Sequence, residues 1–369
     1  MPELDSVRGI AVLAVIVFHG LARPLHAQLP AFGRLLFTLS QHGWAGVNLF
    51  FVLSGFLITG ILLDSNRRPD YFRRFYFRRA LRILPALYGM LLLLLIGGWI
   101  SSSFAAISIL FLANFGGVLG VGLGYGPLWT LAVEEHFYML WPLVVRRCSV
   151  RILTILASTV WLGSPILRIL TLVGSPVPQH FASLYTWFNL DGLSLGALLA
   201  IWLRVPSFRR YHLACIAPLV MTVSAAAFFF LVGRPWADAT VEKSVCNLAS
   251  AGFLSCVLLV GASNWSFLVD QPILKFFGFI SYGLYLVHAL AYHLSDIVLS
   301  RPLAMLMANR EPMAAVLMRF AGGLLLGIAV AYLSRRSLEE KFLRMGYSSR
   351  RAPFSASTPA ADAPIRANA

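Results

Sequence analysis

Long apolar segments separated by short polar ones recur along almost the whole chain. A helix needs about 20 mostly apolar residues to cross the hydrocarbon core of a bilayer, which is ~30 Å thick. We expect spans at 9–26, 44–63, 83–100, 127–145, 152–173, 187–204, 212–232, 246–262, 273–298 and 314–336. The pattern therefore predicts an all-α, polytopic integral membrane protein with about ten transmembrane helices.

The segments around these spans indicate how the chain is organised. Residues 104–120 are apolar but glycine-rich, so we expect a re-entrant or lumenal segment there instead of a span. The first apolar segment has no convincing cleavage site after it, which favours a retained helix over a signal peptide. The prediction is one transmembrane domain over residues 1–347, followed by a Pro-, Ala- and Ser-rich, disordered cytoplasmic tail over 348–369.

Composition supports the membrane assignment, and the charges orient the chain. With 59% hydrophobic and 12% charged residues, the chain lacks the polar side chains that cover a soluble globule. The net charge of +15 does not indicate nucleic-acid binding, because the basic residues are not interleaved with stacking aromatic residues on any water-exposed domain. With the N-terminus inside, 22 Lys and Arg fall on the cytoplasmic side and eight elsewhere, which predicts N-in, C-in topology. The four cysteines lack metal-ligand spacing, so no metal site is expected.

Ionisable residues inside predicted spans are functional candidates, because each costs ~2.5–3.5 kcal/mol to insert. His19 follows Arg8 by eleven residues, which places it ~16 Å above the cytoplasmic interface. Glu134 and Glu135 lie on a helix that runs inward from about Pro127, at nearly the same depth. We expect one glutamate to face His19. The alternatives are a histidine satisfied by a backbone carbonyl and a glutamate pair that only holds helices together.

A cluster of arginines precedes and enters the third predicted span. On a helix, Arg82 shares one face with Arg78 and Arg79, which lie four and three residues before it. Guanidinium groups bind phosphate through paired hydrogen bonds, which suits a donor that carries a nucleotide diphosphate. The alternative is a positive-inside anchor that binds anionic lipid.

Further polar residues lie in later spans. Asp191 is one candidate, and Tyr282, Tyr285 and His288 recur every three residues, so the last three share a helix face. A packing face with interfacial aromatic residues is the alternative interpretation.

Five segments together resemble a known family. They are LDSVRGIAVLAVIVFHG, GVNLFFVLSGFLITGIL, FYFRRALRILP, LWTLAVEEHFYMLWP and SYGLYLVH, in that order. They resemble the motifs of the acyltransferase-3 family of membrane O-acyltransferases, bacterial enzymes that acetylate surface polysaccharides, lipopolysaccharide, Nod factors and some antibiotics. The resemblance covers about residues 3–336. Some relatives also carry an SGNH domain, which we do not expect here.

The resemblance implies partners and residue roles. The co-substrate would be acetyl-CoA or another acyl-CoA, the acceptor a carbohydrate or glycolipid, and the location the bilayer of the bacterial inner membrane. The implied catalytic residues are His19, Glu134 and Glu135. The residues implied for the acyl-CoA site are Arg8, Arg79 and Arg82. Our candidates for the acceptor site are Asp191, Tyr285 and His288.

In the expected mechanism, neutral His19 removes the acceptor's hydroxyl proton while the oxygen attacks the thioester carbonyl. A glutamate would orient the imidazole and stabilise its protonated form. Direct transfer and a transient acyl-histidine are both compatible with these residues. The rival class is a transporter or flippase of a lipid-linked sugar, because buried His, Glu and Arg also build proton relays and substrate paths.

Overall fold

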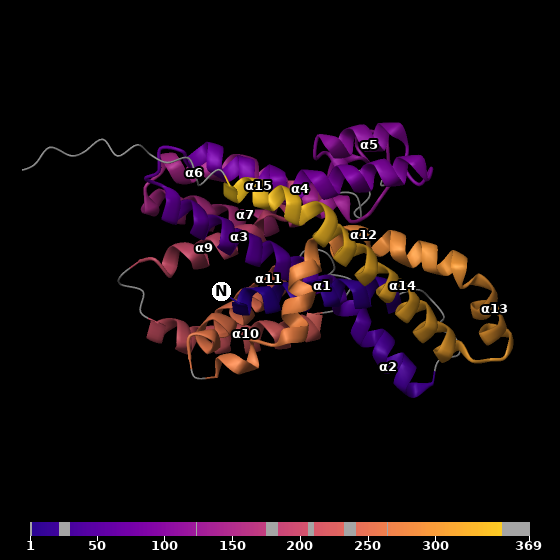
Figure 1. The fold of residues 1–369 in the computed structure, drawn as a ribbon. Coiled ribbons are helices and arrows are strands. Elements are labelled where there is room, and N and C mark those ends of the chain that lie inside the picture. The colour runs from indigo at the N-terminus through magenta and orange to yellow at the C-terminus, as the bar shows by residue number, and fades with distance from the viewer. Residues whose placement is uncertain are drawn as a thin grey trace, which may run out of the picture.

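The computed structural model describes residues 2–21, 30–122, 124–174, 184–205, 210–231, 241–263 and 265–348. Every regular element within these ranges is a helix (Figure 1). The predicted all-α class is therefore confirmed. The predicted disordered tail lies outside the described residues from position 349 onward and stays a prediction.

Nine helices of the described chain have 20 or more residues. They are α1 Pro2–Leu21, α3 Ala45–Ser65, α4 Tyr71–Ile96, α6 Leu128–Arg147, α7 Val150–Gly174, α10 Arg210–Leu231, α11 Val241–Gly261, α12 Pro272–Val298 and α14 Pro312–Ser334. The shorter α-helices are α2 Ala31–Ser40, α5 Ser102–Ile109, α9 Leu190–Trp202, α13 Ser300–Ala308 and α15 Glu340–Ser348. Four 3-10 turns and one π-helical turn connect them: η2 Gln41–Trp44, η3 Ala113–Phe115, η4 Thr186–Phe188, η5 Ser266–Leu268 and η6 Arg335–Glu339.

Eight helical stretches in the described ranges are long and apolar enough to cross a membrane. Two further predicted spans coincide with α6 and α9, which do not meet both criteria. Helix α6 has 20 residues but carries Glu134 and Glu135 near its middle. Helix α9 has only 13 residues, or ~20 Å of rise, which is less than a full hydrocarbon core. Each of the ten predicted spans thus overlaps a helix, and α9 is buried over Asp191–Ile201 whereas α6 is buried on one side only.

Two boundaries differ from the sequence-based expectation in ways that affect the site. Helix α4 begins at Tyr71, twelve residues before the predicted start at 83, so the arginine cluster is helical. The glycine-rich segment after α4 forms the short α5 and η3, followed by turns in which Gly120 and Gly122 have positive φ. Left-handed backbone of this kind favours glycine, which explains why 104–120 does not continue as a spanning helix.

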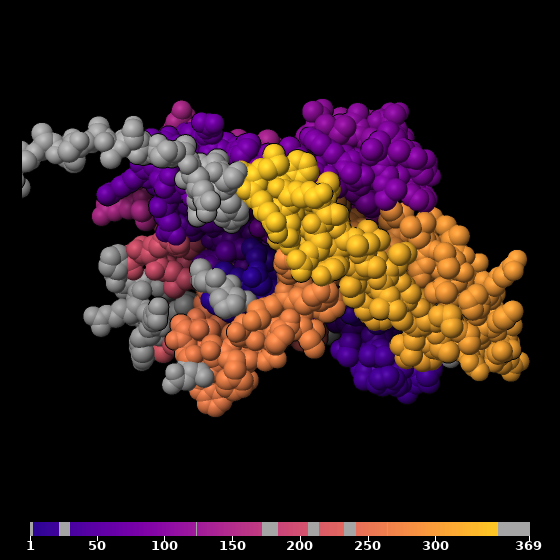
Figure 2. Space-filling view, viewed as in Figure 1, coloured from indigo at the N-terminus to yellow at the C-terminus, as the bar shows by residue number. Residues whose placement is uncertain are grey.

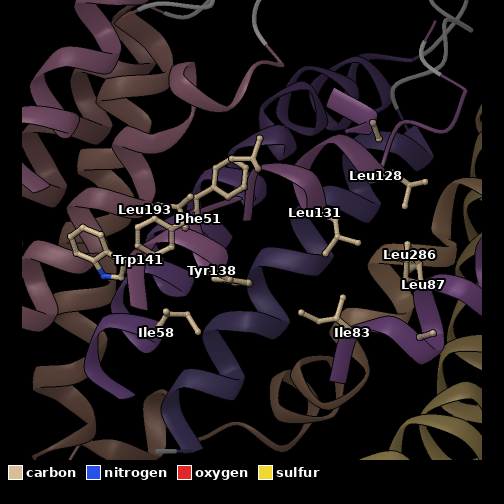
Figure 3. Packing of buried hydrophobic residues seen from close by; sticks show 14 of the residues in the cluster. Phe51, Ile58, Ile83, Leu87, Leu128, Leu131, Tyr138, Trp141, Leu193 and Leu286 are labelled. Carbon is tan, nitrogen blue, oxygen red and sulfur yellow. The ribbon is translucent and has the colours of Figure 1, made fainter. Parts of the chain in front are cut away.

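The centre of the bundle is a close crossing of α3 and α9. A Cβ added at Gly55 would lie 1.9 Å from the Leu193 carbonyl oxygen, and one at Gly196 would lie 1.9 Å from that of Val52. Only glycine allows this approach of two backbones, as at other small-residue interfaces between membrane helices. Around the crossing, buried side chains of α3, α4, α6, α9 and α12 form one apolar cluster (Figure 3).

Helix α1 packs in the same way against α12. A Cβ at Gly9 would lie 2.1 Å from the Leu274 carbonyl oxygen, and one at Gly278 would lie 1.9 Å from that of Asp5. Helix α14 covers α12, and the C-terminal α15 lies on α4, so the yellow C-terminal segment crosses the face shown in Figure 2. The α1–α12 contact determines where His19 lies.

Candidate active site

A cavity of about 110 Å³ lies between α1, α3, α4, α6 and α12. Most of its wall is apolar, and its polar residues come from all five helices. They are Arg8, Ser54, Arg79, Arg82, Thr130, Glu134, Tyr138, Ser281, Tyr282 and Tyr285. Five of the nine site residues predicted from the sequence, Arg8, Arg79, Arg82, Glu134 and Tyr285, are therefore brought to one cavity.

One face of α6 supplies the carboxylate of the cavity. Thr130, Glu134 and Tyr138 line it at four-residue spacing. Glu134 Oε1 accepts a hydrogen bond of 2.7 Å from the Ser54 hydroxyl. The Glu135 side chain is rotated about 100° around the helix axis from that of Glu134. Glu135 is buried and does not line the cavity. The structure thus separates the two glutamates, and Glu134 is the one available to a bound molecule.

The arginines gather at one end of the cavity. The Arg79 guanidinium lies 4.6 Å from the ring centroid of Tyr138 and 5.9 Å from that of Phe75, so two aromatic rings hold it. Arg8 pairs with Asp5 on its own helix at 2.5 Å. Arg82 lies near Arg8, Arg79 and Arg335, with Glu134 and Glu339 as its acidic neighbours. An excess of guanidinium groups at the end of a small cavity favours an anion there.

A second, larger cavity of about 430 Å³ adjoins this end, because Arg79 and Arg82 line both. Its charged wall consists of Asp64, Arg68, Arg74, Arg78, Arg79 and Arg82. Asp64 is already bonded to Arg204 at 2.7 Å, so the remaining charge of this wall is positive. We call this space the arginine cavity.

Side-chain contacts connect the wall of the small cavity to two histidines. The hydroxyls of Thr130 and Tyr285 are 2.7 Å apart at the cavity wall. The Tyr285 ring lies 5.6 Å from the ring of His288, which in turn lies 4.7 Å from the ring of His19. His19 itself is exposed and does not line the cavity. A row of contacts therefore connects the cavity through Tyr285 and His288 to His19.

The expected contact between His19 and a glutamate is not formed among the described residues. His19 Nδ1 is 3.0 Å from the Val15 carbonyl oxygen, which is the backbone alternative that the sequence left open. The physical reason is the packing of α1, which lies against α12, α14 and α3, whereas Glu134 is bonded to Ser54 on α3. Counting residues along each span predicts matching depths for His19 and Glu134, but it does not predict which helices lie next to each other.

Asp191 belongs to a separate buried network. Its carboxylate accepts a hydrogen bond of 2.7 Å from Arg168 Nη2, and the two residues are 1% and 3% exposed. Arg168 also donates to the Phe188 carbonyl oxygen and to Ser244. In this conformation the Asp191 carboxylate is bonded to Arg168, and the role of Asp191 in acceptor binding stays a prediction.

Sequence reasoning missed several residues of the cavity. Thr130 and Tyr138 lie one turn on either side of Glu134, so the helical spacing could have identified them. Ser54 is a polar residue in an otherwise apolar span, which is a weaker signal. Within the described ranges, no group of three His, Cys, Asp or Glu side chains could hold a metal ion.

Comparison with known proteins gives one family and several relatives. The profile of a family described as "Acyltransferase domain" matches residues 1–336. The peptidoglycan O-acetyltransferase OatA of Listeria monocytogenes is 27% identical over 71% of this chain and 39% of its own length. The putative peptidoglycan O-acetyltransferase YrhL of Bacillus subtilis is 27% identical over 82% of this chain and 49% of its own.

A putative O-acetyltransferase of Staphylococcus aureus is also 27% identical, over 78% of this chain and 50% of its own length. The chain thus spans half or less of each of these relatives. No solved structure gives a significant match.

Proposed function

This chain belongs to the acyltransferase family whose profile covers residues 1–336, and on that premise we propose that it is a membrane O-acetyltransferase. It would move an acetyl group from acetyl-CoA to a hydroxyl of a polysaccharide or glycolipid. The named relatives are peptidoglycan or putative O-acetyltransferases, which supports O-acetylation as the reaction. We place the protein in the bacterial inner membrane, with the arginine cavity facing the cytoplasm.

The observation that carries the proposal is that two adjacent cavities share Arg79 and Arg82 in their walls. Coenzyme A ends in a phosphorylated nucleotide, which needs a wide, positively charged site, and its pantetheine arm is narrow. The arginine cavity has the charge for the phosphates, and the small cavity has an apolar wall for the arm. In this arrangement Arg79 and Arg82 bind the diphosphate where the two spaces meet, and Arg8 contributes from α1.

The size of the small cavity supports a short acyl chain. An engineered cavity of ~150 Å³ in another protein holds one benzene molecule, and the cavity here measures about 110 Å³. An acetyl thioester fits a space of that size, whereas a long acyl chain does not. We therefore propose acetyl-CoA as the preferred donor.

The proposed base is His19. The Val15 carbonyl oxygen can only accept a hydrogen bond, so Nδ1 of His19 carries the hydrogen and Nε2 of the neutral ring is basic. Nε2 would take the hydroxyl proton as the acceptor oxygen bonds to the acetyl carbon. The carbon–sulfur bond then breaks, and the thiolate recovers a proton from the imidazolium. A positioned base of this kind typically contributes ~10²–10⁴-fold in rate.

Glu134 has a different proposed role, because it lies beside Arg79 and Ser54 instead of His19. Its carboxylate would orient the Arg79 guanidinium toward the phosphates that Arg79 and Arg82 bind together. The Thr130–Tyr285 pair lies at the wall of the small cavity and contacts His288, which contacts His19, so these hydroxyls would orient the acyl carbonyl of a thioester in the cavity.

The test is transfer of radiolabelled acetyl from acetyl-CoA by the purified, reconstituted protein to a panel of glycans that includes peptidoglycan fragments and lipopolysaccharide. We expect a labelled glycan with the wild type and a loss of about 100-fold or more with His19→Ala. A flippase would move a lipid-linked sugar without covalent change. Wild-type protein that moves the glycan but never labels it would refute the proposal.

A further inference from the structure

The imidazole ring of His19, the proposed base, contacts a second imidazole ring from another helix. The ring centroids of His19 on α1 and His288 on α12 are 4.7 Å apart, with 58° between the ring planes. His288 is 1% exposed, and its Nε2 has no hydrogen-bond partner among the described residues. A buried polar atom without a partner is rare in folded proteins and calls for an explanation.

Backbone carbonyl groups fix the protonation of both rings. Nδ1 of His288 is 2.6 Å from the Tyr285 carbonyl oxygen, and Nδ1 of His19 is 3.0 Å from that of Val15. Because a carbonyl oxygen only accepts, each Nδ1 carries the hydrogen. In the neutral rings both Nε2 atoms therefore have a free lone pair. One of these rings can take a proton at Nε2, and the other can accept the resulting hydrogen bond.

The two helices are held together around this pair. The Tyr292 hydroxyl donates to the Ile16 carbonyl oxygen over 3.2 Å, one turn before His19. Arg319 on α14 donates to the Gly20 carbonyl oxygen at 2.6 Å and pairs with Asp296 at 2.7 Å. Bonds on both sides of His19 thus fix its position against α12, so the contact between the rings is part of the packed structure.

We propose that His288 is a positioning residue that shares the proton of His19 during transfer. This inference rests on the proposed function. When Nε2 of His19 takes the acceptor's proton, the ring becomes an imidazolium, and Nε2 of His288 accepts a hydrogen bond from it. The proton returns through His19 to the thiolate of coenzyme A after the carbon–sulfur bond breaks. His288 thus takes the place of the carboxylate that the sequence led us to expect beside the base.

This hydrogen bond would explain why Nε2 of His288 has no hydrogen-bond partner in the resting structure. In the resting state the His288 ring contacts a neutral imidazole, and its Nε2 has no donor among the described residues. In the protonated state it gains a charge-assisted hydrogen bond, which is stronger than a neutral one. The pair therefore stabilises the state that follows proton removal more than the resting state, which is the requirement for a faster chemical step.

Two substitutions separate proton sharing from packing. His288→Asn keeps an amide at the position of Nδ1, which can still donate to the Tyr285 carbonyl oxygen, but it has no acceptor at the position of Nε2. His288→Gln places an amide oxygen near the position of Nε2 and can accept from His19. We expect His288→Asn to lower kcat about 10- to 100-fold, with the KM for acetyl-CoA changed less than about threefold, and His288→Gln to recover at least about a third of the wild-type kcat.

The control is His293→Asn, which removes an exposed imidazole from the same helix, where it contacts Trp99. Its kcat should stay within about twofold of the wild type. Thermal unfolding in detergent is measured for each variant, so that loss of fold is distinguished from loss of rate. If His288→Asn does not fold, the kcat of His288→Gln is the deciding measurement. A kcat of His288→Gln below about a tenth of the wild-type value would then overturn the inference.

Equal activity of His288→Asn and wild type, or an Asn variant more active than the Gln variant, would also overturn it. These outcomes leave the proposed function intact if the wild type transfers acetyl and His19→Ala does not. A wild type that transfers nothing refutes the proposed function, and the inference falls with it.

Discussion

The role of Arg82 gives the sharpest quantitative prediction. Arg82 lines both cavities, and the described side chains include no hydrogen-bond or ion-pair partner for it. Its charged neighbours include the positive Arg8, Arg79 and Arg335 and the negative Glu134 and Glu339. Glu339 is bonded to Arg335 at 2.9 Å, so an excess of positive charge remains around Arg82. An arginine in such a place is stabilised by a bound anion, and replacing it should affect donor binding before anything else.

The magnitude follows from the hydrogen bonds that a guanidinium makes to a phosphate. A hydrogen bond to a charged group contributes ~1.5–3 kcal/mol, and each 1.4 kcal/mol is tenfold. Arg82→Ala should therefore raise the KM for acetyl-CoA about 10- to 100-fold. Arg82→Lys keeps the charge but not the paired geometry, so we expect it to recover less than about half of that loss in free energy.

The assay is the initial rate of acetyl transfer by reconstituted protein over a range of acetyl-CoA concentrations. Arg67→Ala is the control, because Arg67 is exposed and lines neither cavity. Arg68 would be a poor control, because it lines the arginine cavity. If Arg82→Ala and Arg67→Ala gave the same KM, the arginine cluster would be a lipid anchor and the donor site would be wrong.

Three further predictions concern the acyl chain, the base and the buried ion pair. Acetyl-CoA should be used at least about tenfold better than octanoyl-CoA in competition, because eight carbons exceed the small cavity; equal use would contradict the size argument. His19→Ala should express and unfold like the wild type, since alanine costs less than imidazole in a membrane helix; a large drop in thermal stability would point to a structural role. Asp191→Asn should lower the free energy of unfolding by about 3–5 kcal/mol, because it leaves Arg168 charged, buried and unpaired with a carboxylate. In the same denaturation assay, the double variant Asp191→Asn, Arg168→Met should recover part of that loss.

Helix positions followed from apolar segments alone, because a span in lipid must satisfy its backbone groups internally and has little freedom of length. The deviations occur where function or packing overrides that rule. Helix α9 is only 13 residues long because it is buried by its neighbours and need not face lipid along a full span. Helix α4 begins twelve residues early because its first turns carry the arginines that face the arginine cavity.

The candidate site was partly predictable for the same reason. Helical spacing identifies which residues share a face, so the Arg79–Arg82 pair and the Tyr285–His288 pair were correctly grouped. It does not identify which helix lies opposite. Residue counting predicts similar depths for Glu134 and His19, but α1 packs on α12, so Ser54 is the hydrogen-bond partner of Glu134 and His288 is the ring in contact with His19. Such pairings depend on helix packing, which depth along a span does not specify.

The proposed function has the arginine cavity facing the cytoplasm, and we propose that the donor enters from that side while the acceptor reaches the site from the opposite side of the membrane. The premises of this proposal are the charge-based topology and the arginine cavity. Sealed vesicles of known orientation, loaded with acceptor glycan, test it directly when radiolabelled acetyl-CoA is added outside. Inside-out vesicles should label the enclosed glycan, and sealed right-side-out vesicles should consume no acetyl-CoA. Equal labelling in both preparations, with the seal verified, would contradict the account.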